Sequence, residues 1–262
     1  MVRHTEPQRS SATTNAATTE RRIMKRSPRI IAPLQLPLRS WFLIPVAAAL
    51  LALTLAIGLI AKSYGSFSPE LGLDRELSEA RNPVLNLLAL GIHYGLGPPG
   101  AIALLVAVCG WLGWVRRAPI KSLAFGSITA VGWLSSEIGK LTVARLRPPA
   151  GAIPALVAES GYDSFPSGHT AFVASLLWAV TLVLARPGTQ RLLTAAAGTV
   201  FATAVGLSRV YLGVHYPTDF VGSFLISAAG ILIWLPVWNN LIEPRLLRSA
   251  VLTRLRAATP SP

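Results

Sequence analysis

The feature that most constrains this chain is an apolar run from Trp41 to Ala61, which lies between Arg39 and Lys62 and contains no charged residue. A helix needs roughly 20 mostly apolar residues to cross the hydrocarbon layer of a bilayer. The whole chain has 52% apolar and 13% charged residues, which is too apolar and too poor in charge for an ordinary soluble domain. The sequence therefore predicts an integral membrane protein.

Five further stretches are predicted to cross the membrane as helices: residues 83–115, 119–142, 166–185, 192–212 and 217–242. The first of these exceeds one span, so we expect a short interfacial helix near Val84 to Tyr94 before a crossing that begins at about Pro99. The predicted fold class is all-α, a polytopic bundle of six transmembrane helices over residues 41–242.

The basic residues predict how the bundle is oriented. Of the 24 Lys and Arg residues, eight precede Trp41 and four follow Ile242. Because cytoplasmic segments carry an excess of Lys and Arg, we predict that both termini are cytoplasmic. Residues 1–40 are expected to be a disordered basic tail, and residues 243–262 a second basic tail, either solvated or lying on the membrane as an amphipathic helix. Topology and attraction to anionic lipid account for the net charge of +13, so we predict no nucleic-acid partner.

Polar residues gather at the predicted outer ends of the helices, and the first group contains Lys140 and Arg147. These residues are seven apart, or two helical turns, so both side chains can lean toward one site. Pro148 disfavours helical geometry at Arg147, so the helix is expected to end there. A pair of cations that snorkel to the interface is the structural alternative.

The second group is the segment GYDSFPSGHTAF, residues 161–172. Pro166 is expected in the first turn of a helix, which places the amides of Ser167, Gly168 and His169 among the free donors of a helix start. Such a start binds anions, and His169 would place a proton donor beside the ligand. A capping or surface histidine is the alternative.

The third group surrounds His215. Pro217 predicts another helix start, so Asp219 falls near the third helical position and can reach back to His215. A carboxylate on one ring nitrogen fixes the tautomer and leaves the other nitrogen free to attack. Arg209 adds a guanidinium suited to phosphate. A buried His–Asp pair that only joins two helices is the alternative.

Together the three groups resemble the pattern K-x6-RP, PSGH and SR-x5-H-x3-D of the type 2 phosphatidic acid phosphatase (PAP2) superfamily, which is related in motif to vanadium-dependent haloperoxidases. The resemblance covers roughly residues 70 to 240. It implies that His215 attacks phosphorus to give a phosphohistidine, that Asp219 orients its ring, and that His169 protonates the leaving oxygen and then activates water. The phosphoryl oxygens would be held by Lys140, Arg147, Ser167, Gly168 and Arg209. No metal or other cofactor is expected, and activity is expected on the mildly acidic to neutral side.

Several residues outside the pattern are further candidates. His93 can line the entrance or be a satisfied interfacial histidine. A second set lies on or near the loop between the first two motifs, where it can contact a headgroup or simply keep the loop soluble: Arg145, Glu159, Tyr162 and Asp163.

A phosphate pocket flanked by apolar helices indicates a lipid substrate. The expected function is hydrolysis of a lipid phosphate or diphosphate, such as undecaprenyl pyrophosphate, phosphatidylglycerophosphate or phosphatidic acid, on the extracytoplasmic face of a bacterial inner membrane. The alternatives are a phosphotransferase with the same intermediate, a haloperoxidase, and a nonenzymatic transporter or scaffold. The sequence does not indicate an oligomeric state.

Overall fold

The structure is a computed structural model that describes residues 34, 36–65, 68–159 and 161–249, and within these ranges it contains helices and no strand. The helices are α2 Leu43–Ser63, α3 Leu71–Glu79, α4 Pro83–Leu96, α5 Pro98–Gly110, α6 Pro119–Val143, α7 Gly168–Ala179, α8 Thr189–Tyr211 and α9 Pro217–Val237. Three π-helical segments continue α5, α7 and α9, respectively η2 Trp111–Val115, η3 Val180–Leu184 and η4 Trp238–Ile242.

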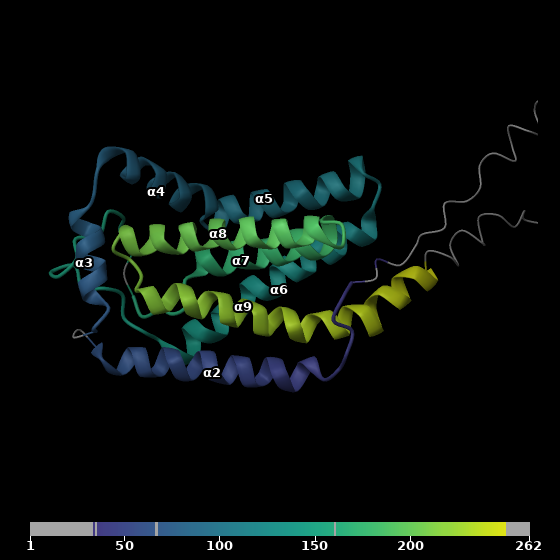
Figure 1. Ribbon diagram of the computed structural model, residues 1–262, viewed down its shortest axis with the longest axis horizontal. Helices are drawn as coiled ribbons and strands as arrows, with labels where there is room; N and C mark the ends of the chain where they lie inside the picture. The colour runs from purple at the N-terminus through teal and green to yellow at the C-terminus, as the bar shows by residue number, and fades with distance from the viewer. Residues whose placement is uncertain (1–33, 35, 66–67, 160, 250–262) are drawn as a thin grey trace, which may run out of the picture. The chain divides into compact units, whose positions relative to one another are not determined.

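Helix α7 lies among α6, α8 and α9, and α2 packs along α9. Figure 1 shows α2 on one side of this group and α4 and α5 on the opposite side, while α3 crosses the end at which α8 finishes and α9 begins. The ends of α4, α6 and α8 therefore meet the starts of α7 and α9 at one end of the bundle.

The helix starts follow local sequence. Pro217 is the first residue of α9, where its missing N–H would have had no helical partner. The side chain of Asn82 caps α4 by accepting a hydrogen bond of 3.0 Å from the amide of Leu85. The stretch 83–115 divides at Gly97 into α4 and α5, in agreement with the expected short helix and separate crossing.

Three local predictions differ from the structure. Helix α6 ends at Val143 and not at Arg147, because Ala144 adopts the left-handed conformation, so Lys140 and Arg147 do not lie on one helix. Helix α7 begins at Gly168 and not at Pro166, because Ser167 is extended and its amide donates to the carbonyl oxygen of Asp219 at 3.3 Å. Helix α3 was not predicted, since its sequence LGLDRELSE is mostly polar and Asp74 is its only fully buried residue.

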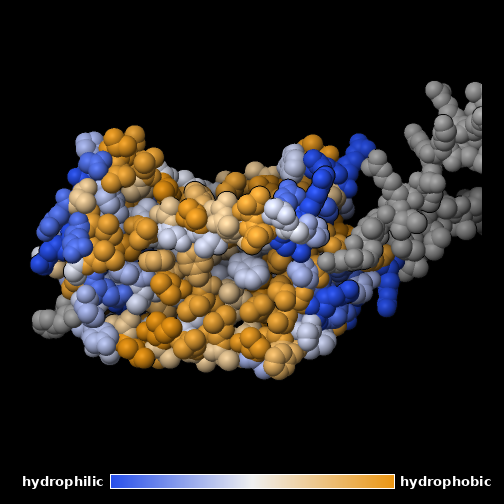
Figure 2. Space-filling view, in the orientation of Figure 1, coloured by the Kyte–Doolittle hydropathy of each residue, from blue (hydrophilic) through white to orange (hydrophobic). Residues whose placement is uncertain are grey.

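Among the described residues, four helices are long and apolar enough to cross a membrane: Leu43–Ser63, Pro98–Val115, Thr189–Tyr211 and Pro217–Ser249. Helix α6 is 25 residues long but is not among them, and the α7–η3 segment is shorter. The face shown in Figure 2 is apolar along its middle and polar toward both ends. Large apolar side chains such as Leu141 and Leu192 are exposed on the helices, as a lipid-facing surface requires. These features are those of an integral membrane bundle.

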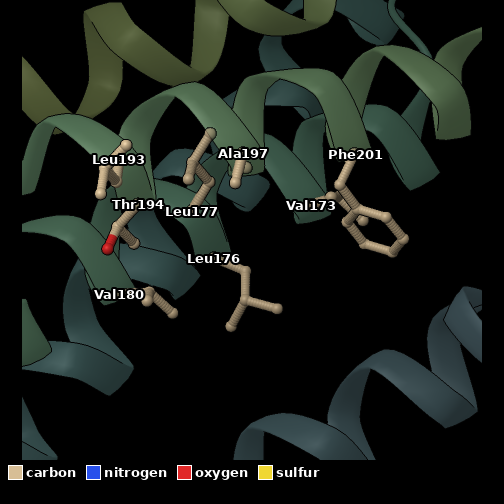
Figure 3. A pocket seen from close by; sticks show the side chains of 9 residues that line it. Val173, Leu176, Leu177, Val180, Leu193, Thr194, Ala197 and Phe201 are labelled. Atoms are coloured by element: carbon tan, nitrogen blue, oxygen red, sulfur yellow. The ribbon is translucent and has the colours of Figure 1, made fainter. Parts of the chain in front are cut away.

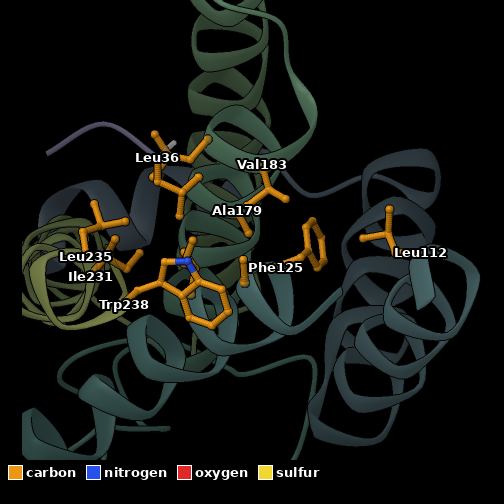
Figure 4. Packing of buried hydrophobic residues seen from close by; sticks show 11 residues of the cluster. Leu36, Leu112, Phe125, Ala179, Val183, Ile231, Leu235 and Trp238 are labelled. Carbon is orange, nitrogen blue, oxygen red and sulfur yellow. The ribbon is translucent and has the colours of Figure 1, made fainter. Parts of the chain in front are cut away.

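A buried apolar cluster closes the end of the bundle away from the start of α7. It joins Phe125 of α6, Val183 of η3 and Trp238 of η4, and Figure 4 shows Leu36 packed against them. Leu36 is 2% exposed, and the side-chain amide of Asn240 donates to the carbonyl of Arg39 at 2.8 Å. Residues 36–40 of the predicted tail therefore pack with the bundle, whereas residues 1–33, 35 and 250–262 lie outside the described residues.

The segment before α7 is held by glycines that face it. A Cβ added at Gly58 of α2 would lie 2.6 Å from the ring of Phe165, and one added at Gly222 of α9 would clash with the same ring. Gly139 of α6 gives Pro166 the same close approach, at 2.5 Å. No side chain larger than hydrogen fits at these three positions, so the packing of α2, α6 and α9 fixes where α7 begins.

Candidate active site

A cavity of about 630 Å³ opens at the end of the bundle where α7 begins. Five of the eight predicted site residues line it: Lys140, Arg147, Gly168, His169 and His215. The other three, Ser167, Arg209 and Asp219, are fully buried behind its wall. Further residues that line it include His93, Glu137, Glu159 and Asp163.

A second cavity of about 540 Å³ lies between α7 and α8 (Figure 3). Figure 3 shows Leu176, Leu177 and Phe201 beside it, and Thr194 is the one polar side chain among the residues that line it. It contains no titratable group, so we assign the chemistry to the first cavity.

His215 and Asp219 form the predicted pair at the start of α9. Nδ1 of His215 lies 3.3 Å from Oδ2 of Asp219, and both side chains are buried. The same Oδ2 accepts from the hydroxyl of Ser164 and, at 2.9 Å, from the amide of Tyr216. This last bond, from a carboxylate at the third helical position to the amide of the residue before the helix, agrees with the prediction from Pro217 that Asp219 turns back toward the helix start.

The tautomer of His215 follows from its second neighbour. Nη1 of Arg147 lies 3.2 Å from Nε2 of His215. A guanidinium group has N–H donors and no lone pair, so Nε2 must be the acceptor. The ring proton of the neutral imidazole then lies on Nδ1 and points to Asp219, while the Nε2 lone pair lies at the wall of the cavity.

Burial lowers the pKa of His215, and the charge of Arg147 acts in the same direction against the opposing effect of Asp219. His215 is therefore a neutral imidazole at pH 7, with a lone pair available at Nε2.

His169 lies on the first turn of α7 beside α4. Its Nε2 is 3.1 Å from the carbonyl oxygen of His93, and because a carbonyl only accepts, this nitrogen carries a proton. The two imidazole rings stack with centroids 5.4 Å apart. Nδ1 of His169 remains to accept or release a second proton at the cavity.

Two cations line the cavity and a third lies behind its wall, each from a different segment. Lys140 lies near the end of α6, and its Nζ is 3.3 Å from where a Cβ of residue 168 would stand. It also pairs with Glu137 at 2.8 Å. Arg147 follows α6 and donates to the carbonyl of Val214 at 3.0 Å. Arg209, near the end of α8, is fully buried.

Glu159 links two of these cations. One of its oxygens lies 2.6 Å from Nη1 of Arg147, and the other accepts a hydrogen bond from Nη2 of Arg209. Burial alone would raise the pKa of Glu159, but the charges of Arg209 and Arg147 outweigh it and hold the pKa at about 2. A carboxylate of the chain thus occupies the guanidinium donors that would face a phosphate.

His93 is a neutral partner of Arg209. Nη1 of Arg209 donates to Nδ1 of His93 at 2.7 Å, so Nδ1 carries no proton. Burial first, and then the charge of Arg209, lower the pKa of His93. The side chain both lines the cavity and is satisfied by hydrogen bonding, so it combines the two roles that its sequence position left open.

The remaining candidates divide between the cavity and its surroundings. Asp163 lines the cavity and accepts from Nε of Arg147 at 3.1 Å. Tyr162 is 66% exposed and is not among the lining residues. Arg145 is 3% exposed and is also not among them, so it does not lie where a headgroup in the cavity would contact it.

A sequence profile of the PAP2 superfamily matches residues 121–243, the segment that contains all eight predicted site residues. Phosphatidylglycerophosphatase B of Bacillus subtilis is 31% identical over 163 residues, which cover 59% of this chain and 77% of that protein. The chain belongs to the PAP2 superfamily.

Two further comparisons agree with this assignment. An undecaprenyl-diphosphatase of Sulfolobus acidocaldarius is 37% identical over 95 residues, 35% of this chain and 43% of that protein. The crystal structure of a transmembrane PAP2-type phosphatidylglycerolphosphate phosphatase from Bacillus subtilis has the same fold, with a TM-score of 0.59 and 23% identity over 79% of this chain and 96% of that one. The PAP2 profile and the named phosphatase relatives together support a lipid phosphatase.

The PAP2 sequence pattern includes the predicted catalytic residues but not the residues that connect the three motifs through side-chain contacts. Glu159 and His93, both named above as candidates outside the pattern, each contact a motif arginine. Their positions in the sequence did not identify these contacts, because His93 lies in α4 and Glu159 in the connection between α6 and α7. Among the described residues, no three His, Cys, Asp or Glu side chains are placed to hold one metal ion.

Proposed function

We propose that this PAP2 protein hydrolyses a lipid phosphate or diphosphate through a phosphohistidine intermediate on His215. The observation that carries the proposal is the placement of the His215 Nε2 lone pair at the wall of a cavity that also contains Lys140, Arg147 and His169. A nucleophile, a proton donor and cations for a developing charge are the groups that phosphoryl transfer needs.

In the first half of the reaction, a phosphate oxygen would take the donors of Arg147, which frees the Nε2 lone pair of His215. Nε2 attacks phosphorus, and the bond from phosphorus to the leaving oxygen breaks. His169, protonated beside the substrate dianion, gives its Nδ1 proton to that oxygen. Asp219 accepts the Nδ1–H bond of His215 and stabilises the positive charge that the ring acquires.

In the second half, neutral His169 would take a proton from a water molecule as the water attacks phosphorus. The phosphorus–nitrogen bond breaks, and inorganic phosphate leaves with His215 neutral again. Throughout, Lys140 and the amide of Gly168 would hold the equatorial oxygens, and Arg209 and the Ser167 hydroxyl would support them from behind the wall.

The substrate would be a lipid whose tail stays in the bilayer, such as undecaprenyl pyrophosphate, phosphatidylglycerophosphate or phosphatidic acid. The names of the two relatives support this class. The basic residues in or beside the η2–α6 and η3–α8 connections, at the end away from the cavity, support an extracytoplasmic site and cytoplasmic termini by the excess of Lys and Arg on the cytoplasmic side: Arg116, Arg117, Lys121, Arg186 and Arg191. The cavity end also contains basic residues outside the helices, namely Arg81, Arg145 and Arg147. With α6 and α7–η3 as additional crossings, the four apolar spans would make six.

The test is a panel of these lipid phosphates in detergent, scored by release of inorganic phosphate from wild type, His169→Ala and His215→Ala. We expect wild type to act on at least one of them and both variants to lose activity by roughly 10³-fold or more. Protein quenched in alkaline denaturant, which preserves phosphohistidine, should carry phosphate on His215 in wild type and, more strongly, in His169→Ala given a substrate with a good leaving group, and should carry none in His215→Ala. Phosphate transferred to added alcohol, with little free phosphate, would indicate the phosphotransferase instead.

A further inference from the structure

Arg145 is a buried cation that does not line the cavity. Ala144 ends α6 in the left-handed conformation, with φ of 48°, and Arg145 follows it directly. The side chain then passes behind Asp219, on the side away from the cavity, where 3% of the residue is exposed. A buried guanidinium needs partners for its charge and its donors, so its contacts indicate its role.

The guanidinium of Arg145 joins two carboxylates. Nη1 donates to Oδ1 of Asp219 at 2.8 Å and to the hydroxyl of Thr218 at 2.7 Å. Nη2 donates to Oε2 of Glu70 at 2.7 Å and to Ser68 at 3.4 Å. The guanidinium carbon also lies 3.8 Å from the ring centroid of Tyr216, so the plane of the group is fixed from a third side.

Glu70 fixes the far end of this arrangement. Its Oε1 accepts from the amide of Thr218 at 2.7 Å, and its Oε2 accepts from the Thr218 hydroxyl at 3.0 Å. A carboxylate on a first-turn amide stabilises the start of a helix. Glu70, which directly precedes α3, therefore both caps α9 and neutralises the charge of Arg145.

The orientation of Asp219 depends on these contacts. Arg145 holds Oδ1, while Ser164, the amide of Tyr216 and Nδ1 of His215 all lie against Oδ2. With Oδ1 fixed, the carboxylate cannot rotate to take Oδ2 away from the imidazole. The positive charge of Arg145 also keeps a carboxylate ionised in a place that water does not reach.

We infer that Arg145, with Glu70 as its counter-ion, is a positioning residue that acts through Asp219 to hold the nucleophile His215 in its reactive tautomer. The inference rests on the proposed function, since it assigns a role toward that reaction. Arg145 does not line the cavity, so it is not expected to bind phosphate.

The variants Arg145→Gln, Arg145→Lys and Glu70→Gln test this inference, with Arg81→Gln as a matched control. Arg81 makes three hydrogen bonds to the carbonyls of Tyr211 and Pro154 at the same end of the bundle, with no contact to Asp219. We expect Arg145→Gln to lower kcat by roughly 10- to 100-fold, the usual effect of losing a partner that orients a reactive group. KM and the inhibition constant of inorganic phosphate should change by less than about twofold.

The dependence of kcat on pH distinguishes a role of Arg145 in positioning Asp219 from a role in folding stability alone. Without the charge of Arg145, the acid limb of kcat should move to higher pH, because a cation beside Asp219 and His215 disfavours protonation of both. Arg145→Lys should restore the limb in part, because it returns a charge but cannot bridge both carboxylates. Arg81→Gln should leave the limb where it is. The charged and titratable groups that face Asp219 are His215, Arg145, Glu70, Asp74 and Tyr216.

Each result has one meaning. Folded Arg145→Gln protein with unchanged kcat and acid limb would overturn the inference while wild-type turnover leaves the proposed function standing. Absence of turnover and of phosphoenzyme in wild type would overturn the proposed function itself. If Arg145→Gln gives no monodisperse protein, Glu70→Gln decides, because it keeps the shape of the side chain: an unchanged acid limb in that variant would also overturn the inference.

Discussion

Oε2 of Glu159 lies 2.6 Å from Nη1 of Arg147, so a carboxylate of the chain itself holds a cation that faces the cavity. The same side chain pairs with Arg209. A phosphate dianion that enters the cavity meets this negative charge. It must share the two guanidinium groups with the Glu159 carboxylate or displace that carboxylate from them.

Glu159→Gln should therefore tighten phosphate binding. We expect the inhibition constant of inorganic phosphate to fall by roughly tenfold, equivalent to about 1.4 kcal/mol, because the variant removes a like charge beside the ligand. Because the pKa of Glu159 is about 2, the carboxylate is ionised across the neutral range and the effect should not vary with pH there. Glu76→Gln, the same change on the exposed side of α3, is the control. A weaker inhibition by phosphate would mean that Glu159 helps to bind the ligand.

Gly168→Ala tests where the phosphoryl group sits. The new Cβ would lie 3.3 Å from Nζ of Lys140, in the space assigned to a phosphate oxygen. Since only the flexible end of Lys140 has to move, the melting temperature should change little. We expect kcat/KM to fall by roughly 10²-fold, because displacement of the reacting group by about 1 Å has an effect of this size. Gly110→Ala in α5, where a Cβ meets nothing within 4 Å, is the matched control. Full activity of Gly168→Ala would place the phosphoryl group elsewhere.

His215 as the proposed nucleophile predicts how activity falls on the acid side of the pH profile. The pKa of His215 is lowered from an ordinary value of 6.5, so the ring stays neutral to a lower pH than a free histidine. Protonation at Nε2 removes the lone pair, and the fall in kcat/KM on the acid side should have its midpoint below pH 6.5. His169 must carry a proton in the first half of the reaction, so activity should also fall on the basic side. The measurement is kcat/KM from acidic to basic pH, and a flat profile through this range would contradict the mechanism.

The sequence predicted the parts of the site that local rules control. Prolines mark helix starts, and the third helical position reaches back to the residue before the helix, so the pairing of Asp219 with His215 could be predicted from spacing alone. The meeting of Lys140, His169 and His215 at one cavity followed from placing each motif at the same end of its helix.

The contacts that the sequence could not reveal are those between segments without periodicity. Glu70 reaches Thr218 across 148 residues of chain, and Glu159 reaches Arg209 across 50. No spacing rule connects such positions, because the packing of whole helices sets their distance. Arg145 stands inside the K-x6-RP motif, yet its direction depends on the left-handed turn at Ala144, which the sequence does not mark with glycine.

Asp74 gives a prediction on stability. It is 0% exposed, and neither carboxylate oxygen has a hydrogen-bond partner among the described residues. Burial, followed by the charges of Glu70 and Asp219, raises its pKa from 3.8 to about 7. Between these two values the unfolded chain releases the proton while the folded chain keeps it, so stability falls as pH rises through this window and stays at the lower level above it.

Asp74→Asn cannot ionise and should escape this loss. We expect its melting temperature in detergent to exceed that of wild type at about pH 8 by roughly 2–4 °C, equivalent to about 1 kcal/mol, with a smaller difference at about pH 5. Glu79→Gln, on an exposed carboxylate of the same helix, should change the melting temperature equally little at both pH values. If wild type is as stable as Asp74→Asn at about pH 8, the ionised Asp74 carboxylate must have a partner that stabilises its charge. Asp74 would then be a third ionised carboxylate near Arg145, beside Glu70 and Asp219.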